Sequence, residues 1–340
     1  LRLALAQKAG LGTPEHALVA TALPLVDGGP RRLVHGVLGT LLRRGIPPMD
    51  SPRLPEAVEQ RWAKAWGDDV VASARRLIAK RPPLDLSFVD DAEAQSFPES
   101  SGGRSLARRH VRLRDAGSVS KLPGFGEGRW WVQDLAASLP ARMIPVDAGD
   151  VLDLCAAPGG KTMQMAGAGH QVTAVDQSDS RLKRLCENLE RTGLDAQLVK
   201  ADALHWKPDR TFDAILLDAP CSATGTFRRH PEVLYRARPA IVREGAELQR
   251  QLLDRAATWL KPGGALVYSV CSLEPEEGEA VITGFLERNR DFTVDPPIAG
   301  GLPDFVTPDE RGFLPILPGL MESEGGLDGF FIARLVRTAT

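Results

Sequence analysis

Apolar and polar positions divide the chain into two parts with different periodicities. From about residue 127 onward, short apolar runs alternate with helical segments; the runs lie at 151–155, 172–176, 197–202, 213–218 and 265–271. The helical segment 181–193 carries an apolar face and ends at Gly193, and a second helical segment runs from about residue 243 to residue 260. Strands separated by helices imply parallel pairing, so this part predicts a doubly wound α/β sheet.

The first 126 residues show a different pattern. Residues 1–45 are predicted to be helical, because apolar positions within 31–44 recur at helix spacing, with a pair of arginines at each end of this segment. A second helical stretch is predicted from about Pro55 to Lys80. Residues 84–125 are less regular and contain the densest positive run, GRSLARRHVRLRD at 103–115. Taken alone, that run fits a solvated face as well as it fits nucleic-acid contact.

Composition narrows the class of protein. The 340 residues are 43% hydrophobic and 25% charged with a net charge of −2, so RNA contact would have to come from local basic patches. No apolar run approaches the ~20 residues of a membrane span, and the N-terminus lacks a signal-peptide layout. We therefore expect a cytoplasmic chain without a membrane partner. Because residue 1 is leucine, we also expect the chain to begin inside a longer gene product.

The four cysteines indicate free thiols. They lie at 155, 186, 221 and 271 without C-x-x-C spacing, and the six histidines form no ligand pattern with them. A metal site is therefore not expected, and the usage fits a reducing cytosol.

A glycine turn follows the first run of the sheet, in VLDLCAAPGGKT at 151–162. Its end matches a phosphate-binding loop, but Cys155 stands in place of that loop's first glycine, which makes a triphosphate site the weaker alternative. Asp176 ends the second apolar run, where a carboxylate usually accepts hydrogen bonds from ribose hydroxyls. Asp202 ends the third run, where its side chain can reach an adenine edge. A ligand with a ribose and a carboxylate but no phosphate fits best, namely S-adenosylmethionine. We expect Asp153 to brace the turn and Cys155 to be a small buried residue.

Two cysteines fall just beyond the fourth and fifth runs, where a parallel sheet holds its ligands. A lone cysteine is usually an inert core residue, but Cys221 and Cys271 would converge beside the cofactor. A thiolate that adds to carbon 6 of cytosine makes carbon 5 nucleophilic toward a sulfonium methyl, with Asp218 placed to stabilise the charge. A second polar group must then assist release. Because the base must be unstacked, single-stranded or loop RNA is the easier substrate.

Three sequence blocks carry a family resemblance. CAAPGGKT, DAPCSATGTFRRHPEV and YSVCSLEPEEGE resemble the signature blocks of the Sun-type (RsmB-like) rRNA cytosine-5 methyltransferases, and the resemblance covers essentially the whole chain. It implies that Cys271 is the nucleophile, that Cys221 assists release, and that Lys161 and Asp218 lie at the reacting centre. It also implies a set of cofactor-binding residues: Cys155, Ala156, Ala157, Pro158, Gly159, Gly160, Lys161, Asp176, Asp202 and Asp218.

The resemblance also implies the domain organisation. Residues 1–50 would be part of an all-α NusB-like RNA-binding domain, residues 51–125 linker helices and a small α+β module, and residues 126–340 a Rossmann-like S-adenosylmethionine-dependent catalytic domain. The chain departs from the family pattern at Val270, where threonine is usual, and at Ala223, where glycine is common. The segment 84–91 lacks the family's arginine–asparagine pair.

The segment TFRRHPEVLYRARP at 226–239 follows Cys221 and mixes arginines with aromatic residues, so RNA contact is predicted for Arg228, Arg229, His230 and Arg236. Trp130 and Trp131 are expected to pack in the core rather than stack on a base. The predicted function is methylation of carbon 5 of a cytosine in rRNA, most plausibly small-subunit rRNA, by a monomer that uses S-adenosylmethionine. The alternatives are a tRNA cytosine-5 methyltransferase and a catalytically silent RNA-binding ribosome assembly factor.

Overall fold

The computed structural model describes residues 1–26, 28–45, 52–114, 116–297 and 301–339. The chain divides into two compact units, residues 1–52 and residues 53–340. The first unit is helical, with α1 (Arg2–Leu11), α2 (Glu15–Ala22), the 3₁₀ turn η1 (Leu23–Leu25) and α3 (Pro30–Arg44). Its small core is formed by Ala4, Leu18, Leu38 and Leu42. The predicted boundary at residue 50 lies outside the described residues, and the likeness to a NusB domain stays a prediction.

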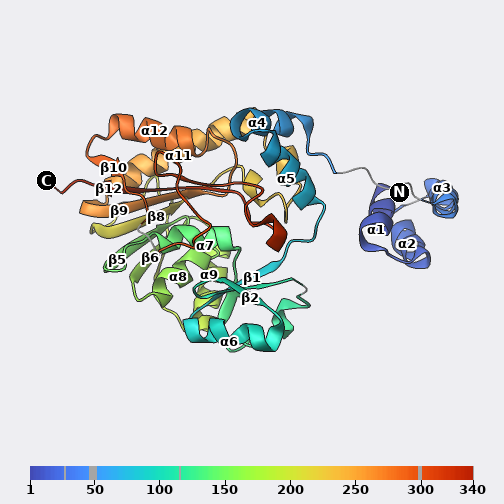
Figure 1. Ribbon diagram of the computed structural model, residues 1–340, viewed down its shortest axis with the longest axis horizontal. Coiled ribbons are helices and arrows are strands. Elements are labelled where there is room, and N and C mark those ends of the chain that lie inside the picture. Colours follow the sequence, from blue (N-terminus) through green and yellow to red (C-terminus); the bar gives the residue numbers. More distant parts are fainter. Residues whose placement is uncertain (27, 46–51, 115, 298–300, 340) are drawn as a thin grey trace. The chain divides into compact units, whose positions relative to one another are not determined.

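The second unit contains the predicted doubly wound sheet (Figure 1). Its strands lie in the order β10-β12-β9-β8-β5-β6-β7. The five predicted strands are β5 (Asp150–Leu154), β6 (Gln171–Asp176), β7 (Gln197–Lys200), β8 (Phe212–Asp218) and β9 (Leu260–Val270), and all pair in parallel. β12 (Phe330–Arg337) runs antiparallel to β9 and also pairs with β10 (Phe292–Val294) and β11 (Leu314–Ile316). The predicted α/β fold class is confirmed.

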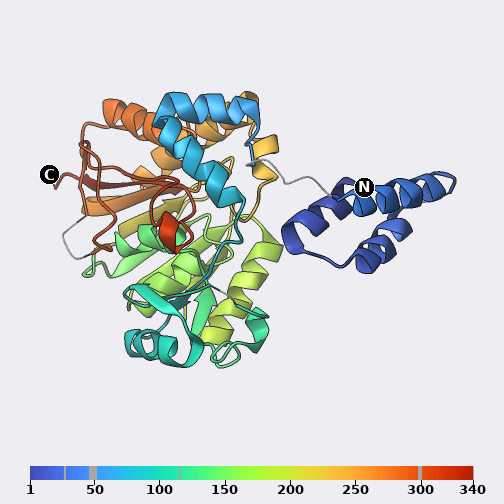
Figure 2. The ribbon, with the colours of Figure 1, turned by 45° about the vertical axis from the view of Figure 1, so that its right-hand side comes forward.

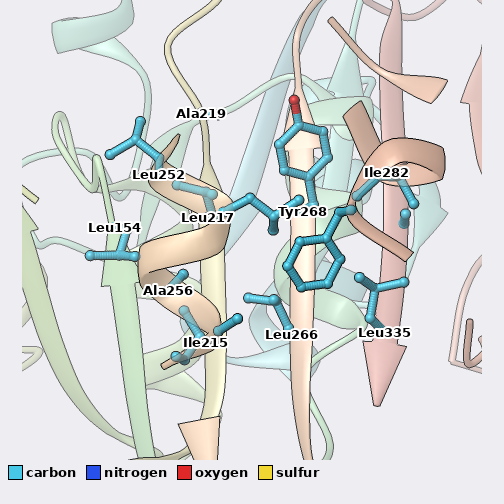
Figure 3. Close-up of a cluster of buried hydrophobic side chains, with 14 of the residues drawn as sticks. Leu154, Ile215, Leu217, Ala219, Leu252, Ala256, Leu266, Tyr268, Ile282 and Leu335 are labelled. Carbon is cyan, nitrogen blue, oxygen red and sulfur yellow. The ribbon is translucent and has the colours of Figure 1, made fainter. Parts of the chain in front are cut away.

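Helices cover both faces of this sheet (Figures 1 and 2). One face packs against α7 (Leu135–Arg142), α8 (Gly160–Gly167) and α9 (Asp179–Thr192), and the other against α11 (Pro239–Ala257) and α12 (Glu279–Arg288). Figure 3 shows this second layer, where Leu217 and Leu266 of the sheet belong to the same buried cluster as Leu252 of α11. Each fully buried leucine contributes about 1.5–3 kcal/mol. Because helices cover both faces of the sheet, side chains on both sides of each strand are apolar, and the strands are continuous apolar runs in the sequence.

The segment between the helical unit and the sheet holds two helices and a small antiparallel sheet. The helical stretch predicted for 55–80 is in fact two helices, α4 (Glu56–Trp66) and α5 (Asp68–Ile78), separated at Gly67 with φ 90°. A left-handed backbone angle cannot continue a right-handed helix, which is why the stretch breaks there. The small sheet has the order β2-β3-β1-β4 and consists of β1 (Leu84–Phe88), β2 (Arg104–Ala107), β3 (His110–Leu113) and β4 (Trp130–Val132), with α6 (Asp91–Ser101) beside it.

Two tryptophans on β4 join the small sheet to the large one. Trp130 is buried with Leu86 and Phe88 of the small sheet, and Trp131 is buried against Met163 and Leu185 of the core helices. Both are packed inside the protein, as the sequence predicted. The remaining short elements are η2 (Val119–Lys121), η3 (Thr224–Thr226), α10 (Val233–Arg236) and η4 (Glu322–Glu324). Among the described residues, no helix is both long and apolar enough to cross a membrane.

Candidate active site

A cleft of about 450 Å³ opens at the carboxyl ends of β5, β8 and β9. Ligands of doubly wound sheets occupy this edge, because the loops after the parallel strands meet there. The predicted site residues that line the cleft are Ala156, Ala157, Pro158, Gly160, Lys161, Asp218, Arg229 and Cys271. Further lining residues come from β4 and its surroundings, including Phe125, Trp131 and Gln133, and from the start of β12, Asp328 and Phe330.

The turn after β5 has a backbone that only small residues fit. Gly159 has φ 105°, and a Cβ atom there would lie 2.6 Å from Leu185 Cδ1. Any side chain at this position would therefore clash with α9 as well as strain the backbone. Cys155 also has a positive φ, 60°, and burial raises its thiol pKa to about 12. This thiol stays protonated, which fits the prediction of a small lining residue rather than a nucleophile.

Asp153 holds the start of α8. Thr162 Oγ1 donates to Asp153 Oδ2 at 2.6 Å, and burial raises the Asp153 pKa to about 7. The carboxyl group is almost fully inaccessible. This arrangement supports the predicted bracing of the turn.

A smaller pocket of about 140 Å³ lies on the other side of the turn. Cys155, Asp176, Arg181 and Asp202 are among its lining residues. Asp176 accepts hydrogen bonds from Ala157 N at 3.2 Å and from Ser178 N at 2.9 Å, and a carboxylate retains lone pairs for further donors. Asp202 accepts from the Leu204 amide at 3.0 Å, which lowers its carboxyl pKa. Residues 155–157 of the turn thus lie between the cleft and the smaller pocket. The polar groups of these two spaces could contact different parts of one ligand.

Lys161 and Asp218 form an ion pair at the cleft. Lys161 Nζ donates to Asp218 Oδ2 at 2.7 Å, and Ser269 Oγ donates to Asp218 Oδ1 at 2.8 Å. The Lys161 ammonium also lies 5.4 Å from the centre of the Phe330 ring. Asp218 is therefore held in one orientation by partners from α8 and β9.

The two cysteines of the strand ends lie side by side. Cys221 Sγ and Cys271 Sγ are 3.5 Å apart, and both thiols are free. Cys271 lines the cleft. Cys221 lies beside Cys271 but is not one of the residues that line the cleft. The neighbouring thiol and burial raise the Cys221 pKa well above its usual value, so Cys221 keeps its proton. The structure therefore brings Cys221, Cys271, Asp218 and Lys161 together; their chemical roles stay predictions.

A buried carboxylate that sequence reasoning did not single out connects the two cysteine loops. Glu277 accepts from the Ser222 amide at 2.8 Å and from Ser272 Oγ at 2.6 Å, and Ser222 Oγ donates to it as well. Ser222 follows Cys221 and Ser272 follows Cys271, so one side chain fixes the spacing of both thiols. Burial raises the Glu277 pKa.

The loop after Cys221 contains the family departure at Ala223. Ala223 has φ 58° and ψ 22°, a left-handed conformation that glycine adopts freely and that costs alanine about 1–2 kcal/mol. The Cys221 loop thus holds alanine in a backbone conformation that favours glycine, the residue that the family resemblance predicts there.

The predicted RNA contact by Arg228 is wrong. Its side chain is 1% exposed, and it donates to Asp134 Oδ2 at 2.7 Å and to Asp328 Oδ1 at 3.1 Å. A guanidinium committed in this way cannot reach a phosphate, and instead it ties the start of α7 to the start of β12. Burial raises the pKa of Asp134 to about 7. Arg229 also pairs with Asp328, but it is 39% exposed and lines the cleft.

His230 and Arg236 lie on the exposed surface that follows, and their contact with RNA stays a prediction. Within the described ranges, no group of three or more histidine, cysteine, aspartate or glutamate residues is placed to hold a metal ion.

Comparison with known proteins identifies the family of this core. Residues 141–336, more than half of the chain, match the family described as 16S rRNA methyltransferase RsmB/F. The chain belongs to this family. Curated RsmB/F relatives named ribosomal RNA small subunit methyltransferase B include that of Salmonella arizonae, 40% identical over 74% of this chain and 56% of the relative. That of Erwinia tasmaniensis is 37% identical over 84% of this chain and 65% of its own length. The chain thus spans between about half and two thirds of these relatives.

Solved structures agree on the fold. A methyltransferase homologue from Pyrococcus horikoshii is 27% identical, with a TM-score of 0.65 over 89% of this chain and 99% of that chain. NSun6 from Pyrococcus horikoshii, solved with SFG, is 19% identical, with a TM-score of 0.71 over 85% of this chain and 99% of that chain. The RsmB/F core therefore has the Rossmann-like methyltransferase fold that the sequence predicted.

Proposed function

We propose that this RsmB/F chain methylates carbon 5 of a cytosine in small-subunit rRNA through a covalent cysteine adduct. The observation that carries the proposal is the pair of thiols, 3.5 Å apart, at the cleft that Lys161 and Asp218 share. The names of the curated relatives support rRNA as the substrate. We place the reaction in the cytoplasm, where rRNA is made and modified in a bacterium.

The cofactor of this methyltransferase core is S-adenosylmethionine, which supplies an electrophilic methyl group. The smaller pocket suits its nucleoside, since Asp176 can accept from ribose hydroxyls and Asp202 lies where an adenine edge would come. The cleft beyond residues 155–157 then has room for the reacting end and for a base. The predicted cofactor residues Cys155 to Lys161 fall on the boundary between these two spaces.

Each cleft side chain has a distinct part in the proposed reaction. The Cys271 thiolate forms a bond to carbon 6 of the cytosine, and the electron pair of the 5,6 double bond moves to carbon 5, which takes the methyl group. The added thiolate brings negative charge onto the ring, and a proton shared between Asp218 and N3 neutralises this charge; Lys161 and Ser269 orient Asp218 for the contact. Loss of the carbon-5 proton to solvent water then returns the electron pair to the 5,6 bond and expels Cys271 as a thiolate. Cys221, protonated and in contact with Cys271, assists this release.

Single cysteine replacements test the assignment. Cys271→Ala should abolish methyl transfer to in-vitro-transcribed small-subunit rRNA and leave binding of S-adenosylhomocysteine, measured by calorimetry, nearly unchanged. Cys221→Ala should instead accumulate an RNA adduct that migrates as a retarded band on a denaturing gel. Cys186→Ala, which changes a thiol on the surface of α9, is the matched control and should do neither. Normal turnover in Cys271→Ala would refute the mechanism.

The substrate class requires a separate measurement. A tRNA cytosine-5 methyltransferase would use the same core, whereas a silent assembly factor would not need both thiols and Asp218. Bisulfite sequencing of rRNA and tRNA, from cells with and without the gene, distinguishes the three. A lost cytosine modification in small-subunit rRNA supports the proposal, a loss in tRNA supports the first alternative, and no loss supports the second.

A further inference from the structure

A second basic pocket lies outside the cleft, between the small sheet and the helices α7 and α8. It has a volume of about 130 Å³ and is lined by Arg108, Arg109 and Arg142 together with Ser87 and Gln164. Arg108 and Arg109 form the tip between β2 and β3, and Arg142 ends α7. Nothing in the proposed methyl transfer uses these three arginines.

The positive charge of this pocket is not balanced by the protein. Arg142 donates to the Arg108 carbonyl at 2.8 Å and to Ser138 Oγ at 3.2 Å, and Arg109 donates to the Gly167 carbonyl at 2.9 Å. All three acceptors are neutral. Among the described residues, Asp91 is the one carboxylate in contact with these arginines, 3.3 Å from Arg108 Nε, so three guanidinium groups face one acid. Burial and the neighbouring Arg109 lower the pKa of Arg142 to about 10.

Two buried polar atoms of lining residues have no partner within the described structure. Arg109 Nε and Ser87 Oγ are both inaccessible and make no hydrogen bond. Buried donors of this kind are normally paired, because an unmade hydrogen bond costs about 1–3 kcal/mol. Unsatisfied donors beside uncompensated cations are what an oxyanion site contains before its ligand binds.

The backbone holds the arginines in place. Arg109 has φ 54°, and its amide donates to Asp91 Oδ1 at 2.8 Å, which fixes the hairpin tip against the start of α6. Arg142 is held to the same tip through the Arg108 carbonyl. Arg109 and Arg142 are therefore placed in advance, whereas Arg108 is 74% exposed and pairs with Asp91.

The position of this pocket relates it to the cleft. Trp131 and Met163 line both spaces, so the two share a wall. A single RNA strand whose base enters the cleft can therefore bring a neighbouring phosphate to the arginines. Planar guanidinium groups bind phosphate oxygens in pairs, and such contacts position a strand without reading its sequence.

We propose that Arg108, Arg109 and Arg142 form a binding site for one backbone phosphate of the RNA substrate. This inference rests on the proposed function, because it takes RNA as the ligand. It resolves the ambiguity of the basic run at 103–115. The tip of the run binds phosphate, whereas Arg104 and Arg114 pair with Glu324 and Arg112 pairs with the buried Asp85.

The salt dependence of RNA binding tests the site. We would measure the affinity of the full chain for in-vitro-transcribed small-subunit rRNA at several salt concentrations. Arg109→Gln and Arg142→Gln should each weaken binding and reduce the slope of log K against log salt by about 0.7, the value for one lost phosphate contact on a single strand. The double variant should lose no more slope than either single one, because the arginines share one phosphate. Arg142→Lys should restore much of the slope.

Arg114→Gln is the matched control. It removes an equally charged residue of the same basic run that pairs with Glu324 at 3.1 Å and lies outside the pocket. This variant should leave the slope unchanged. Cofactor binding and the melting temperature of every variant would be measured alongside, so that a misfolded variant is recognised and replaced by its lysine counterpart.

The outcomes separate this proposal from the proposed function. The unaltered chain could methylate and bind RNA while the pocket variants show the same salt slope of RNA binding as it does. In that case the phosphate site is refuted and the proposed methyltransferase function is kept. If the unaltered chain binds no RNA, both fail. Inorganic phosphate could instead stabilise the unaltered chain but not Arg109→Gln, while the salt slope of RNA binding is the same for both proteins. That result would mean that the pocket binds free phosphate, and it would overturn the assignment to RNA.

Discussion

Acidic residues close together in the sequence have very different surroundings in this protein. In the segment that follows Cys271, Glu274 and Glu277 are fully buried and hydrogen-bonded, whereas Glu276 between them is exposed. From the sequence alone, a run of carboxylates reads as a solvated surface. The cysteines, Lys161 and Asp218 were predictable because each belongs to a motif at a strand end. Glu277 was not, because only the packing of two loops distinguishes it from its neighbour.

Replacing Glu277 should remove the contact that fixes the spacing of the Cys221 and Cys271 thiols. We expect Glu277→Ala to lower the free energy of unfolding by about 3 kcal/mol, because the part-buried Ser222 donors and the buried Ser272 hydroxyl lose their acceptor. We also expect adduct formation with RNA to slow by roughly 100-fold, since small displacements of reacting groups have effects of that size. Urea denaturation and single-turnover gel assays, well below the melting temperature, measure the two effects.

Two further variants make this prediction specific. Glu276→Ala removes the exposed neighbour and should change neither quantity. Glu277→Gln keeps the size of the side chain and one of its two acceptor oxygens, so it should recover part of both the stability and the rate. If Glu277→Ala reacts with RNA as fast as the unaltered chain does, Glu277 has no positioning role and serves stability alone.

At the scale of elements, helix α4 supports the loop that carries Cys271. Trp66 Nε1 donates to the Leu273 carbonyl at 2.8 Å, and Trp62 Nε1 and Arg61 both donate to Glu274. Leu273 and Glu274 come two and three residues after Cys271. A segment that the sequence presents as a linker helix is therefore part of the framework of the active site.

Trp66→Phe tests this connection with little change of shape. The loss of one hydrogen bond should reduce the free energy of unfolding by about 1 kcal/mol. Methyl transfer should fall several-fold while the affinity for S-adenosylhomocysteine is kept, because the loop and not the cofactor pocket is disturbed. Trp206→Phe, at a tryptophan that packs against Trp259 on another part of the core, is the control and should keep full turnover. Equal losses in both variants would argue against a specific role for α4.

The elements that could be predicted are those with strong periodicity. Strands buried on both faces give unbroken apolar runs, so β5 to β9 were identified, and α9 was identified from one apolar face. The strands of the small sheet were not identified from periodicity, because β2 is partly exposed and the strands are only a few residues long; only the family resemblance implied an α+β module there. The break between α4 and α5 depends on the backbone angle of Gly67, which a helical pattern conceals. Arg228 looked like an RNA contact because its charge was visible and its two buried partners, Asp134 and Asp328, were not.

At the scale of the whole molecule, the complete cleft lies in one of the two compact units. Every residue that lines the cleft and the smaller pocket falls within residues 53–340. We therefore expect a fragment of residues 53–340 to fold cooperatively and to bind S-adenosylhomocysteine with the affinity of the full chain. Calorimetry on both proteins makes the comparison.

The same fragment should bind small-subunit rRNA more weakly if the helical unit contributes to RNA contact, as its predicted likeness to a NusB domain implies. A fragment that melts without cooperativity, or that has lost the cofactor, would show that the helical unit is required for the fold of the core.

The position of β12 has a consequence for how this protein is synthesised. β12 is inserted between β9 and β10, and 59 residues lie between the end of β9 at Val270 and the start of β12 at Phe330. A ribosome adding about 5–20 residues per second needs roughly 3–12 s for that interval. During this time the nascent chain presents an unpaired β9 edge, a template for pairing with other chains. Attachment to the ribosome keeps such chains apart, so premature release before residue 337 would be the step at which this protein is most exposed to aggregation.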